Sequence, residues 1–525
     1  MAKGKSRTQN TIINIITGTG GKLLDTVLKF VVRTVFIHTL GKAYLGINGL
    51  FADILTMLSL TELGLDTAMN FQLYKPLAEG DNRRVCTLMK FYKQAYRVIG
   101  GAIIVIGLCI IPLLPYLIKD YASLEALKIN AVLIFILYLL ETAGTYLFGA
   151  YRSSLLKANQ KKYIVDIVEC AVSIVSCIVQ IVVLVVTKDF LVFTVTWLVM
   201  DLSKTLLNAY VAKRFYPQFF DKDAESLKKS EIRELFKDCG ALFVYKMNSV
   251  VLKATDNLVI SAFLGLTWVG LYSNYLMMYN TIRSFLNQLY NAAKASMGNL
   301  FATETTEKKY QFFQIMNYVT VVFYGLACIG VAVCANELIE NWIGTEYMIP
   351  QPFPLLVGVE ILFHGLKQNL GQIRHVSGIF RKMWFRPVLG MIINLVSSVI
   401  LVKVCGICGV ILGTIISDLL TNFLVDPVII HKYSFEDYKP VSEYYKKNGL
   451  YLLILAGVMA FNLWFASAVT ISHGWISLAF HAAVVVISVF AVFTVLFRKT
   501  RECQYLLQTM KKVAAKVRRR LVRAR

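Results

Sequence analysis

The sequence is dominated by a succession of apolar segments, each long enough to cross a lipid bilayer as a helix. A transmembrane helix needs about 20 mostly apolar residues, because the hydrocarbon core is roughly 30 Å thick. Only 17% of the 525 residues are charged and 57% are hydrophobic, which argues against a soluble protein of this length. We therefore predict an all-α polytopic membrane protein. The apolar segments predict about fourteen transmembrane helices, at residues 11–40, 45–72, 91–118, 127–151, 163–187, 189–212, 236–264, 268–297, 311–334, 349–372, 384–404, 408–430, 449–470 and 474–498.

The charges of the loops predict the orientation of these helices. If the N-terminus is cytoplasmic, the inside segments include the basic runs KPLAEGDNRR, RSSLLKANQKK and RHVSGIFRKMWFR, together with the C-terminal tail. The outside loops are short and contain only Lys42, Lys119 and Lys188 as basic residues. This alternation follows the positive-inside rule through the whole chain, and it predicts that both termini are cytoplasmic.

The loops and motifs argue against an enzyme. The longest loop, residues 213–235, is too short for a catalytic domain. GTGGK at Gly18–Lys22 resembles a phosphate-binding loop, but it lacks both the upstream glycine and the Ser or Thr after the lysine. CGIC at Cys405–Cys408 has no second pair for a metal, so we interpret it as a turn between helices. We expect no catalytic residues, no metal and no organic cofactor.

The two halves of the chain resemble one another at a shift of 224 residues. Lys22 then aligns with Lys246, Val27–Lys29 aligns with Val251–Lys253, and LGKAYLGINGLF at Leu40–Phe51 aligns with LGLTWVGLYSNY. Six helices separate the partners, so both copies run in the same direction, which is a parallel repeat about an axis along the membrane normal. The predicted divisions are a six-helix lobe at 1–212, a cytoplasmic linker at 213–235, a second six-helix lobe at 236–430, two added helices at 431–498 and a tail at 499–525.

The first apolar segment carries four charges on one side. On a helix that turns about 100° per residue, Lys22, Asp25, Lys29 and Arg33 form a single narrow stripe. A charge at the bilayer centre costs at least ~2.5–3.5 kcal/mol, so such a stripe is predicted to face a water-filled cavity. Two other interpretations stay open. Lys22, Asp25 and Lys29 have the spacing of a self-neutralising network, and Arg33 has a position from which it can extend to the interface.

Further intramembrane charges extend the predicted cavity. The cationic residues that we expect to bind substrate are Lys22, Lys29, Arg33, Lys246, Lys253, Arg283 and Lys367. The acids that we expect to couple ions or pair with these cations are Asp25, Asp256, Glu62, Asp166 and Glu360. The excess of lysine in the first and seventh helices favours an anionic ligand, and phosphate suits both lysine and arginine.

The tail, residues 498–525, contains eleven basic residues and one acid, Glu502. Its apolar residues recur at spacings of three and four, which predicts a basic amphipathic helix lying on anionic lipids of the cytoplasmic leaflet. A disordered charged end that only fixes topology is the alternative. Nucleic acid is not an expected partner, because the net charge of +23 already has a topological explanation.

In these features the chain resembles the MOP exporter superfamily and, within it, the polysaccharide-transport (Wzx-type) flippases. The residues that carry the resemblance are RTVFIHTLGKAYLGINGLF (Arg33–Phe51), LSLTELGLDTAMNFQLYKPLA (Leu58–Ala78) and YRSSLLKANQKKY (Tyr151–Tyr163). The resemblance implies a MATE-like fold and a bacterial inner-membrane location. It also implies alternating-access movement of an undecaprenyl-diphosphate-linked oligosaccharide to the outer leaflet for surface polysaccharide synthesis, driven by an H⁺ or Na⁺ gradient beside polysaccharide assembly proteins.

By similarity, Lys22, Lys29, Arg33, Lys246 and Lys253 would hold the diphosphate headgroup. Three alternatives stay open at this stage: a multidrug antiporter of the same superfamily, a lipid II flippase, and a membrane enzyme such as a polysaccharide polymerase. The excess of lysine argues against the antiporter, and the short outer loops argue against the polymerase.

Overall fold

The computed structural model describes residues 7–59, 65–119, 121–122, 124, 129–220, 225–233, 247, 250, 254–379, 383, 385–469, 471 and 474–523. The chain divides into two compact units, Met1–Gly270 and Leu271–Arg525. Within the described ranges every regular element is a helix, which confirms the all-α prediction. The predicted division into lobes, linker, added helices and tail stays a prediction.

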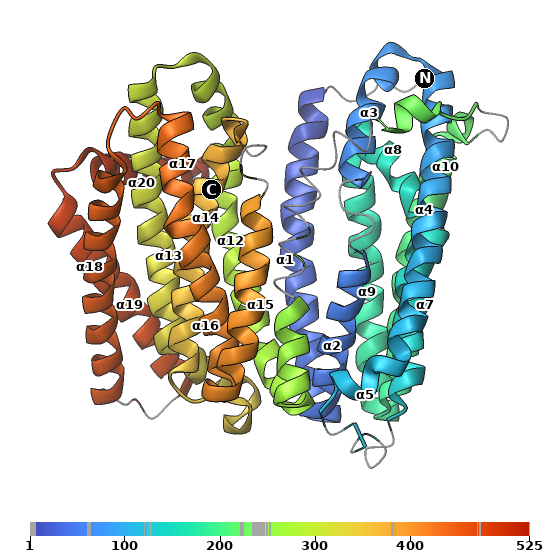
Figure 1. The fold of residues 1–525 in the computed structure, drawn as a ribbon, viewed down its shortest axis with the longest axis horizontal. Helices are drawn as coiled ribbons and strands as arrows, with labels where there is room; N and C mark the ends of the chain where they lie inside the picture. The colour runs from blue at the N-terminus through green and yellow to red at the C-terminus, as the bar shows by residue number, and fades with distance from the viewer. Residues whose placement is uncertain are drawn as a thin grey trace. The chain divides into compact units, whose positions relative to one another are not determined.

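Most helices of the first unit are long and run beside one another, whereas α5 and α8 are short (Figure 1). They are α1 (Arg7–Leu40), α2 (Lys42–Leu58), α3 (Leu65–Glu79), α4 (Asn82–Ile110), α5 (Leu114–Leu117), α7 (Ala131–Leu147), α8 (Ser153–Ala158), α9 (Lys162–Thr187) and α10 (Phe190–Phe215). Three of them begin at residues whose side chains accept backbone N–H groups of the first turn, which is the usual role of an N-cap. The carboxylate of Asp189 accepts from Leu191 at 2.7 Å, and Asp81 and Asn130 do the same for α4 and α7.

The structure places two helices, α2 and α3, where the sequence predicts one at residues 45–72. α2 ends at Leu58, and the backbone N–H of the C-cap residue Ser59 bonds back to the carbonyls of Leu55 and Met57. Such a tightened last turn satisfies carbonyls that have no partner at the end of a helix. Glu62, predicted for ion coupling or charge pairing, lies outside the described residues.

The start of α12 (Leu266–Thr303) crosses α2 at two glycines that are equivalent in the predicted repeat. A Cβ atom on Gly46 would collide with the backbone carbonyl of Leu266, and a Cβ atom on Gly270 would collide with that of Lys42. Adding 224 to 46 and to 42 gives 270 and 266. The 224-residue shift therefore converts the contact of Gly46 with residue 266 into the contact of Gly270 with residue 42. Reciprocal contacts of this kind mark a two-fold axis. The crossing therefore has the symmetry that a parallel repeat predicts.

In its described residues, the second unit contains the rest of α12 and eight further α-helices. They are α13 (Thr306–Ile343), α14 (Phe353–Val376), α15 (Phe385–Cys405), α16 (Ile407–Asp418), α17 (Val425–Ser434), α18 (Val441–Ala468), α19 (Gly474–Phe497) and α20 (Arg501–Arg523). α13 is central to this unit, since it packs against α14, α18, α19 and α20. A π-helical turn at Leu419–Phe423 joins α16 to α17.

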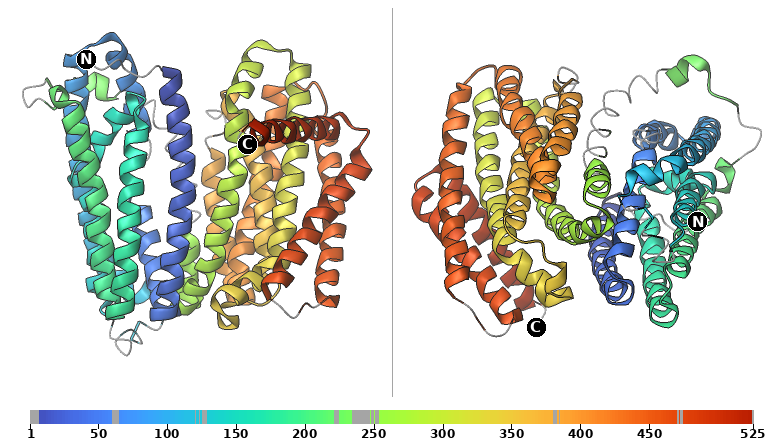
Figure 2. Two further views of the ribbon diagram at one scale, coloured as in Figure 1. Left: turned by 180° about the vertical axis from the view of Figure 1, so that it is seen from behind. Right: turned by 60° about the horizontal axis from the view of Figure 1, so that its bottom comes forward.

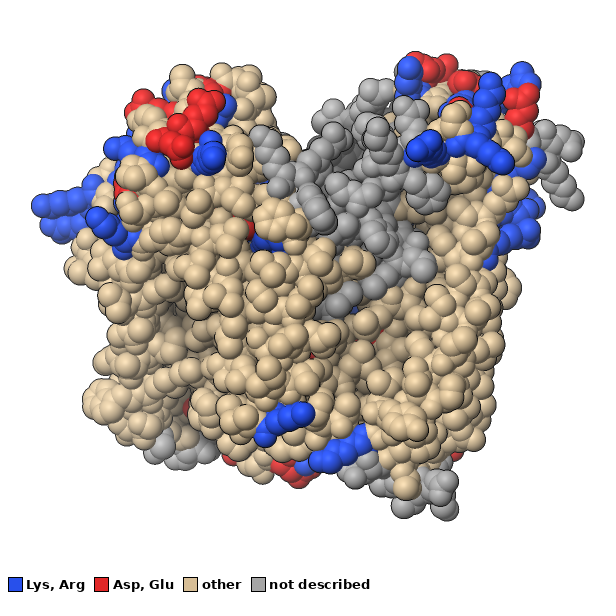
Figure 3. Space-filling model, in the orientation of Figure 1, with Lys and Arg blue, Asp and Glu red and all other residues tan. Residues whose placement is uncertain are grey.

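Nine helical segments in the described parts of the chain are long and apolar enough to cross a membrane. They are Asn82–Leu117, Ala131–Ala158, Lys162–Thr187, Phe190–Phe215, Thr306–Ile343, Phe385–Cys405, Ile407–Ser434, Val441–Ala468 and Gly474–Phe497. On the face drawn in Figure 3, most charged side chains gather near the ends of the helices, and uncharged side chains form a band between. The chain is a multi-pass membrane protein, and the number of fourteen spans stays a prediction.

Candidate functional site

The site is built on α1, whose polar residues fasten it along α9. The Asn14 side chain accepts the backbone N–H of Tyr163 at 2.7 Å and donates to the carbonyl of Gln160 at 2.9 Å. One turn later, the Thr17 hydroxyl donates to the carboxylate of Asp166 at 3.4 Å. These bonds fix the rotation of α1, and so they determine which way its charged stripe faces.

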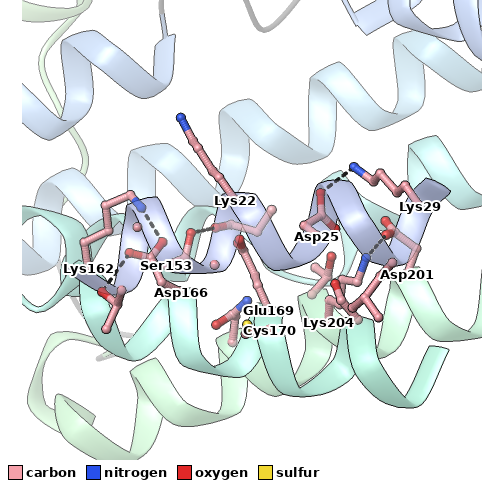
Figure 4. Close-up of a pocket in the computed structure, with 18 of the residues that line it drawn as sticks. Lys22, Asp25, Lys29, Ser153, Lys162, Asp166, Glu169, Cys170, Asp201 and Lys204 are labelled. Atoms are coloured by element: carbon pink, nitrogen blue, oxygen red, sulfur yellow. Dashed lines mark hydrogen bonds and ion pairs between the residues drawn. The ribbon is translucent and has the colours of Figure 1, made fainter. Parts of the chain in front are cut away.

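A cavity of about 470 Å³ lies in the first unit beside this stripe (Figure 4). Its walls come from α1, α9 and α10, and the ends of α7 and α8 complete it. The charged residues that line it are Lys22, Asp25, Lys29, Lys162, Asp166, Glu169, Asp201 and Lys204. Thr17, Thr145, Ser153, Ser173, Thr205 and Asn208 add uncharged polar groups. The cavity thus offers many hydrogen-bonding groups, and its four lysines are matched in number by four carboxylates.

Three of the four lysines are held in ion pairs. Lys204 pairs with Asp201 at 3.0 Å on α10, and Lys162 pairs with Asp166 on α9. Lys29 pairs with Asp25 at 2.7 Å on α1. The Lys29 side chain is 71% exposed, and exposed pairs contribute only about 0–1 kcal/mol, so this pair exchanges readily for a ligand.

Lys22 and Glu169 are the charged lining residues for which the described structure shows no ion pair. Both side chains are exposed to the cavity. Figure 4 shows Lys22 extending away from the labelled carboxylates of α9. The cavity therefore presents one unpaired ammonium on α1 and one unpaired carboxylate on α9.

A further carboxyl group lies directly behind the α10 wall. The side chain of Glu141 on α7 lies beside that of Asp201, which itself pairs with Lys204. The Thr142 hydroxyl donates to Glu141 at 3.1 Å.

The structure brings together some of the predicted site residues and separates others. Lys22, Asp25, Lys29 and Asp166 share the cavity of the first unit. Arg33 lies on the same helix, half-buried and outside the cavity lining. Asp256 is buried in the first unit but does not line the cavity either. Lys246 and Lys253 lie outside the described residues.

The remaining predicted residues lie in the second unit, in two local contacts. The Arg283 guanidinium stacks over the ring of Tyr279 at 5.6 Å, and the Tyr279 hydroxyl donates to Glu360 at 2.8 Å. Lys367 pairs with Asp418 at 2.9 Å, where the Asp418 side chain is 4% exposed. Each contact gives its charges a local partner, and the predicted roles of these residues in binding substrate or coupling ions stay predictions.

The predicted site residues do not include Lys162, Glu169, Asp201 and Lys204 of the cavity lining, or Glu141 beside it. A signal for Lys204 was present, because Asp201 and Lys204 have the i,i+3 spacing of a helical ion pair inside an apolar segment. Glu141 carried no such signal, since Asp201 beside it lies on another helix.

The membrane-crossing helices and the charged cavity of the first unit define a multi-pass membrane protein with a polar internal site. The family model described as polysaccharide biosynthesis protein matches residues 9–293, and the chain belongs to this family. The comparison with curated protein sequences gave no match.

Solved structures of the MOP superfamily share the fold at low sequence identity. The inward-facing conformation of a multidrug resistance MATE family transporter is 14% identical at a TM-score of 0.61, over 79% of this chain and 96% of that one. The lipid II flippase MurJ in an inward closed conformation is 13% identical at a TM-score of 0.61, over 92% of this chain and 99% of that one. The MATE transporter VcmN of Vibrio cholerae is 13% identical at a TM-score of 0.52, over 82% and 99%. These similarities confirm a MATE- and MurJ-like fold.

Proposed function

We propose that this protein moves an oligosaccharide linked to undecaprenyl diphosphate from the inner to the outer leaflet of a bacterial cytoplasmic membrane. The movement serves surface polysaccharide synthesis and proceeds by alternating access, with both termini cytoplasmic. Membership of the polysaccharide biosynthesis family supports this proposal. The observation that carries it is Lys22, an ammonium group without an ion pair in the described structure, at the wall of a polar cavity inside a membrane bundle.

The cavity suits the headgroup of such a lipid. Lys22 presents a point charge to the diphosphate, and Lys29 joins it by leaving its exposed pair with Asp25. The uncharged residues of the lining, such as Thr17, Ser153 and Asn208, exchange hydrogen bonds with sugar hydroxyls. The polyprenyl tail stays in the bilayer, where it keeps its apolar surroundings.

One observation favours a second candidate, a multidrug antiporter. Four carboxylates balance the four lysines of the cavity, so an excess of positive charge no longer argues against a cationic substrate. Glu169 would bind that cation. The family assignment favours the oligosaccharide, and a substrate test separates the two functions.

The test compares Lys22→Ala with Lys22→Arg in proteoliposomes that contain a fluorescent lipid-linked oligosaccharide. We expect Lys22→Ala to slow its movement between leaflets by about tenfold or more, since a charge-assisted hydrogen bond contributes about 1.5–3 kcal/mol. Lys22→Arg retains most of the rate, because arginine also binds phosphate. Lys119→Ala, on a short loop outside the cavity, is the matched control. A normal rate in Lys22→Ala, or export of a cationic dye in place of the oligosaccharide, would refute the proposal.

Transport coupled to an H⁺ or Na⁺ gradient is part of the proposal. The Glu141 and Asp201 carboxyl groups offer a place for a proton beside the cavity wall. Transport is therefore measured under an imposed proton gradient and an imposed sodium gradient, with Glu141→Gln beside the unchanged protein. Loss of the proton response alone in Glu141→Gln supports proton coupling. Transport that still responds to the sodium gradient in Glu141→Gln supports coupling to sodium.

A further inference from the structure

The last helix, α20, lies across the end of the second unit and does not continue the direction of the membrane-crossing helices. α19 ends at Phe497, and the Thr500 hydroxyl caps the new helix by accepting the backbone N–H of Cys503 at 3.4 Å. Figure 2 shows α20 at a steep angle to the helices that it crosses. When α13 and α19 cross the bilayer, α20 consequently lies in the plane of the membrane.

One face of α20 carries a row of apolar residues, and the rest of the protein buries the first of them. The row consists of Cys503, Leu506, Met510, Val513, Val517 and Leu521, which fall within roughly 80° of arc on a helix of about 100° per residue. Cys503 and Leu506 are buried, at 1% and 9% exposed, where α20 packs on α13. Met510, the next residue of the row, is 43% exposed. The protein therefore covers Cys503 and Leu506 and leaves Met510 exposed.

Beyond its first turn, all the charged residues of α20 are basic. Its single acid, Glu502, is mostly buried and pairs with Lys447 of α18 at 3.4 Å. Residues 503–523 contain seven basic residues and no acid. By helical geometry, Lys511 and Arg518 flank one side of the apolar row, Lys516 and Arg520 flank the other, and Lys512 and Arg519 lie on the opposite face.

We propose that α20 beyond Leu506 binds an anionic lipid leaflet. The apolar row enters the boundary between headgroups and acyl chains, and the flanking lysines and arginines contact lipid phosphates. We assign lipid as the binding partner for two reasons. The attachment of α20 to α13 and α18 holds the apolar row in the plane of the membrane surface, and at that surface its basic flanks face the negative charge of the lipid headgroups. This surface is separate from the cavity of the first unit.

The test measures hydrogen exchange by mass spectrometry on the full chain in lipid nanodiscs. One set of discs contains phosphatidylcholine alone, and the other contains phosphatidylglycerol as well. We expect the backbone amides of residues 507–523 to exchange about tenfold or more slowly in the anionic discs, and high salt to remove most of that difference.

Two variants test the two parts of the surface. Replacing Lys511 and Lys516 together with glutamine keeps helix propensity and lowers the difference between the two lipids. Met510→Ser with Val517→Ser keeps every charge, and we expect faster exchange in both lipids because the apolar row is lost.

Lys308→Gln with Lys309→Gln is the matched control, since both lysines lie in the first turn of α13, where Lys308 is exposed and Lys309 is half-buried. It removes two charges from the same unit, and we expect the lipid dependence of residues 507–523 to stay unchanged. Equal exchange in the two lipids, or a lipid dependence that salt does not reduce, would overturn the proposal. So would slow exchange in phosphatidylcholine that depends on protein concentration, because it indicates a second copy of the chain as the occupant.

Discussion

The substitution Gly46→Ala tests the crossing of α2 and α12 most directly. The added Cβ atom would overlap the backbone carbonyl of Leu266, which belongs to a helix and cannot turn aside as a flexible side chain does. The two helices must therefore move apart, or the substituted helix must bend. Overpacking a close contact typically costs about 1–3 kcal/mol, and we expect a loss of stability in that range.

Gly49→Ala is the matched control because it changes the same residue type one turn later on the same helix. Its Cβ atom would lie 3.6 Å from a methyl carbon of Val269 and 3.7 Å from the side-chain nitrogen of Asn257, which are ordinary contact distances. Alanine is also favoured over glycine inside a helix by roughly 0.5–1 kcal/mol. We therefore expect Gly49→Ala to be neutral or slightly stabilising.

The assay is thermal unfolding of the purified full chain in detergent, followed by the loss of its monodisperse elution peak. The Gly46→Ala midpoint is expected to fall below that of the unchanged protein, and the Gly49→Ala midpoint is expected to equal or exceed it. Equal midpoints for the two variants would refute the reasoning, since they would mean that α2 and α12 are not held at backbone contact.

The reciprocal contact gives a second readout. Gly270→Ala should cost about as much as Gly46→Ala, because its Cβ atom would collide with the backbone carbonyl of Lys42. Once one alanine has pushed the two helices apart, the Cβ atom of the second alanine causes a smaller clash. The double variant should then lose less than the sum of the single losses, as expected for residues that share one contact.

Three further outcomes are expected. Lys367→Ala leaves the Asp418 carboxylate, 4% exposed, without its cation and should destabilise the protein by about 1–3 kcal/mol in a thermal unfolding assay, whereas adding Asp418→Ala should restore part of the loss. Asp25→Asn releases Lys29 from its ion pair and should tighten binding of a soluble diphosphate, measured by titration calorimetry, whereas unchanged binding would place Lys29 outside the ligand site. A cysteine at Lys161 should react with an impermeant reagent only after cells are permeabilised, and labelling of intact cells would invert the proposed orientation.

Hydropathy predicted most of the long helices well, because lipid exposure imposes its pattern on a whole segment. The predicted segment 163–187 corresponds to α9 at Lys162–Thr187, and the segment 474–498 corresponds to α19 at Gly474–Phe497. The split between α2 and α3 was not predicted, since it depends on a local change in hydrogen bonding at Ser59 that adds little to the mean hydropathy.

The composition of the cavity could be predicted only in part. Lys22, Asp25 and Lys29 share one helix, so their spacing alone places them on one side. The other three carboxylates of the lining come from α9 and α10, and their orientation depends on how each helix is rotated about its axis. Contacts such as the Asn14 and Thr17 hydrogen bonds set that rotation, and hydropathy does not report them.

The close contacts of Gly46 and Gly270 where α2 crosses α12 support the internal repeat more strongly than sequence similarity alone does. Apolar segments resemble one another by chance, so a shift that aligns Lys22 with Lys246 is weak evidence by itself. The same shift relates Gly46 to Gly270, and these glycines make reciprocal backbone contacts in the folded chain. A chance alignment gives no reason for equivalent residues to meet, whereas a two-fold axis requires it wherever the copies touch. The glycine contacts therefore support the register of 224 residues, and we predict from it that Lys246 is the equivalent of Lys22, for which the described structure shows no ion pair.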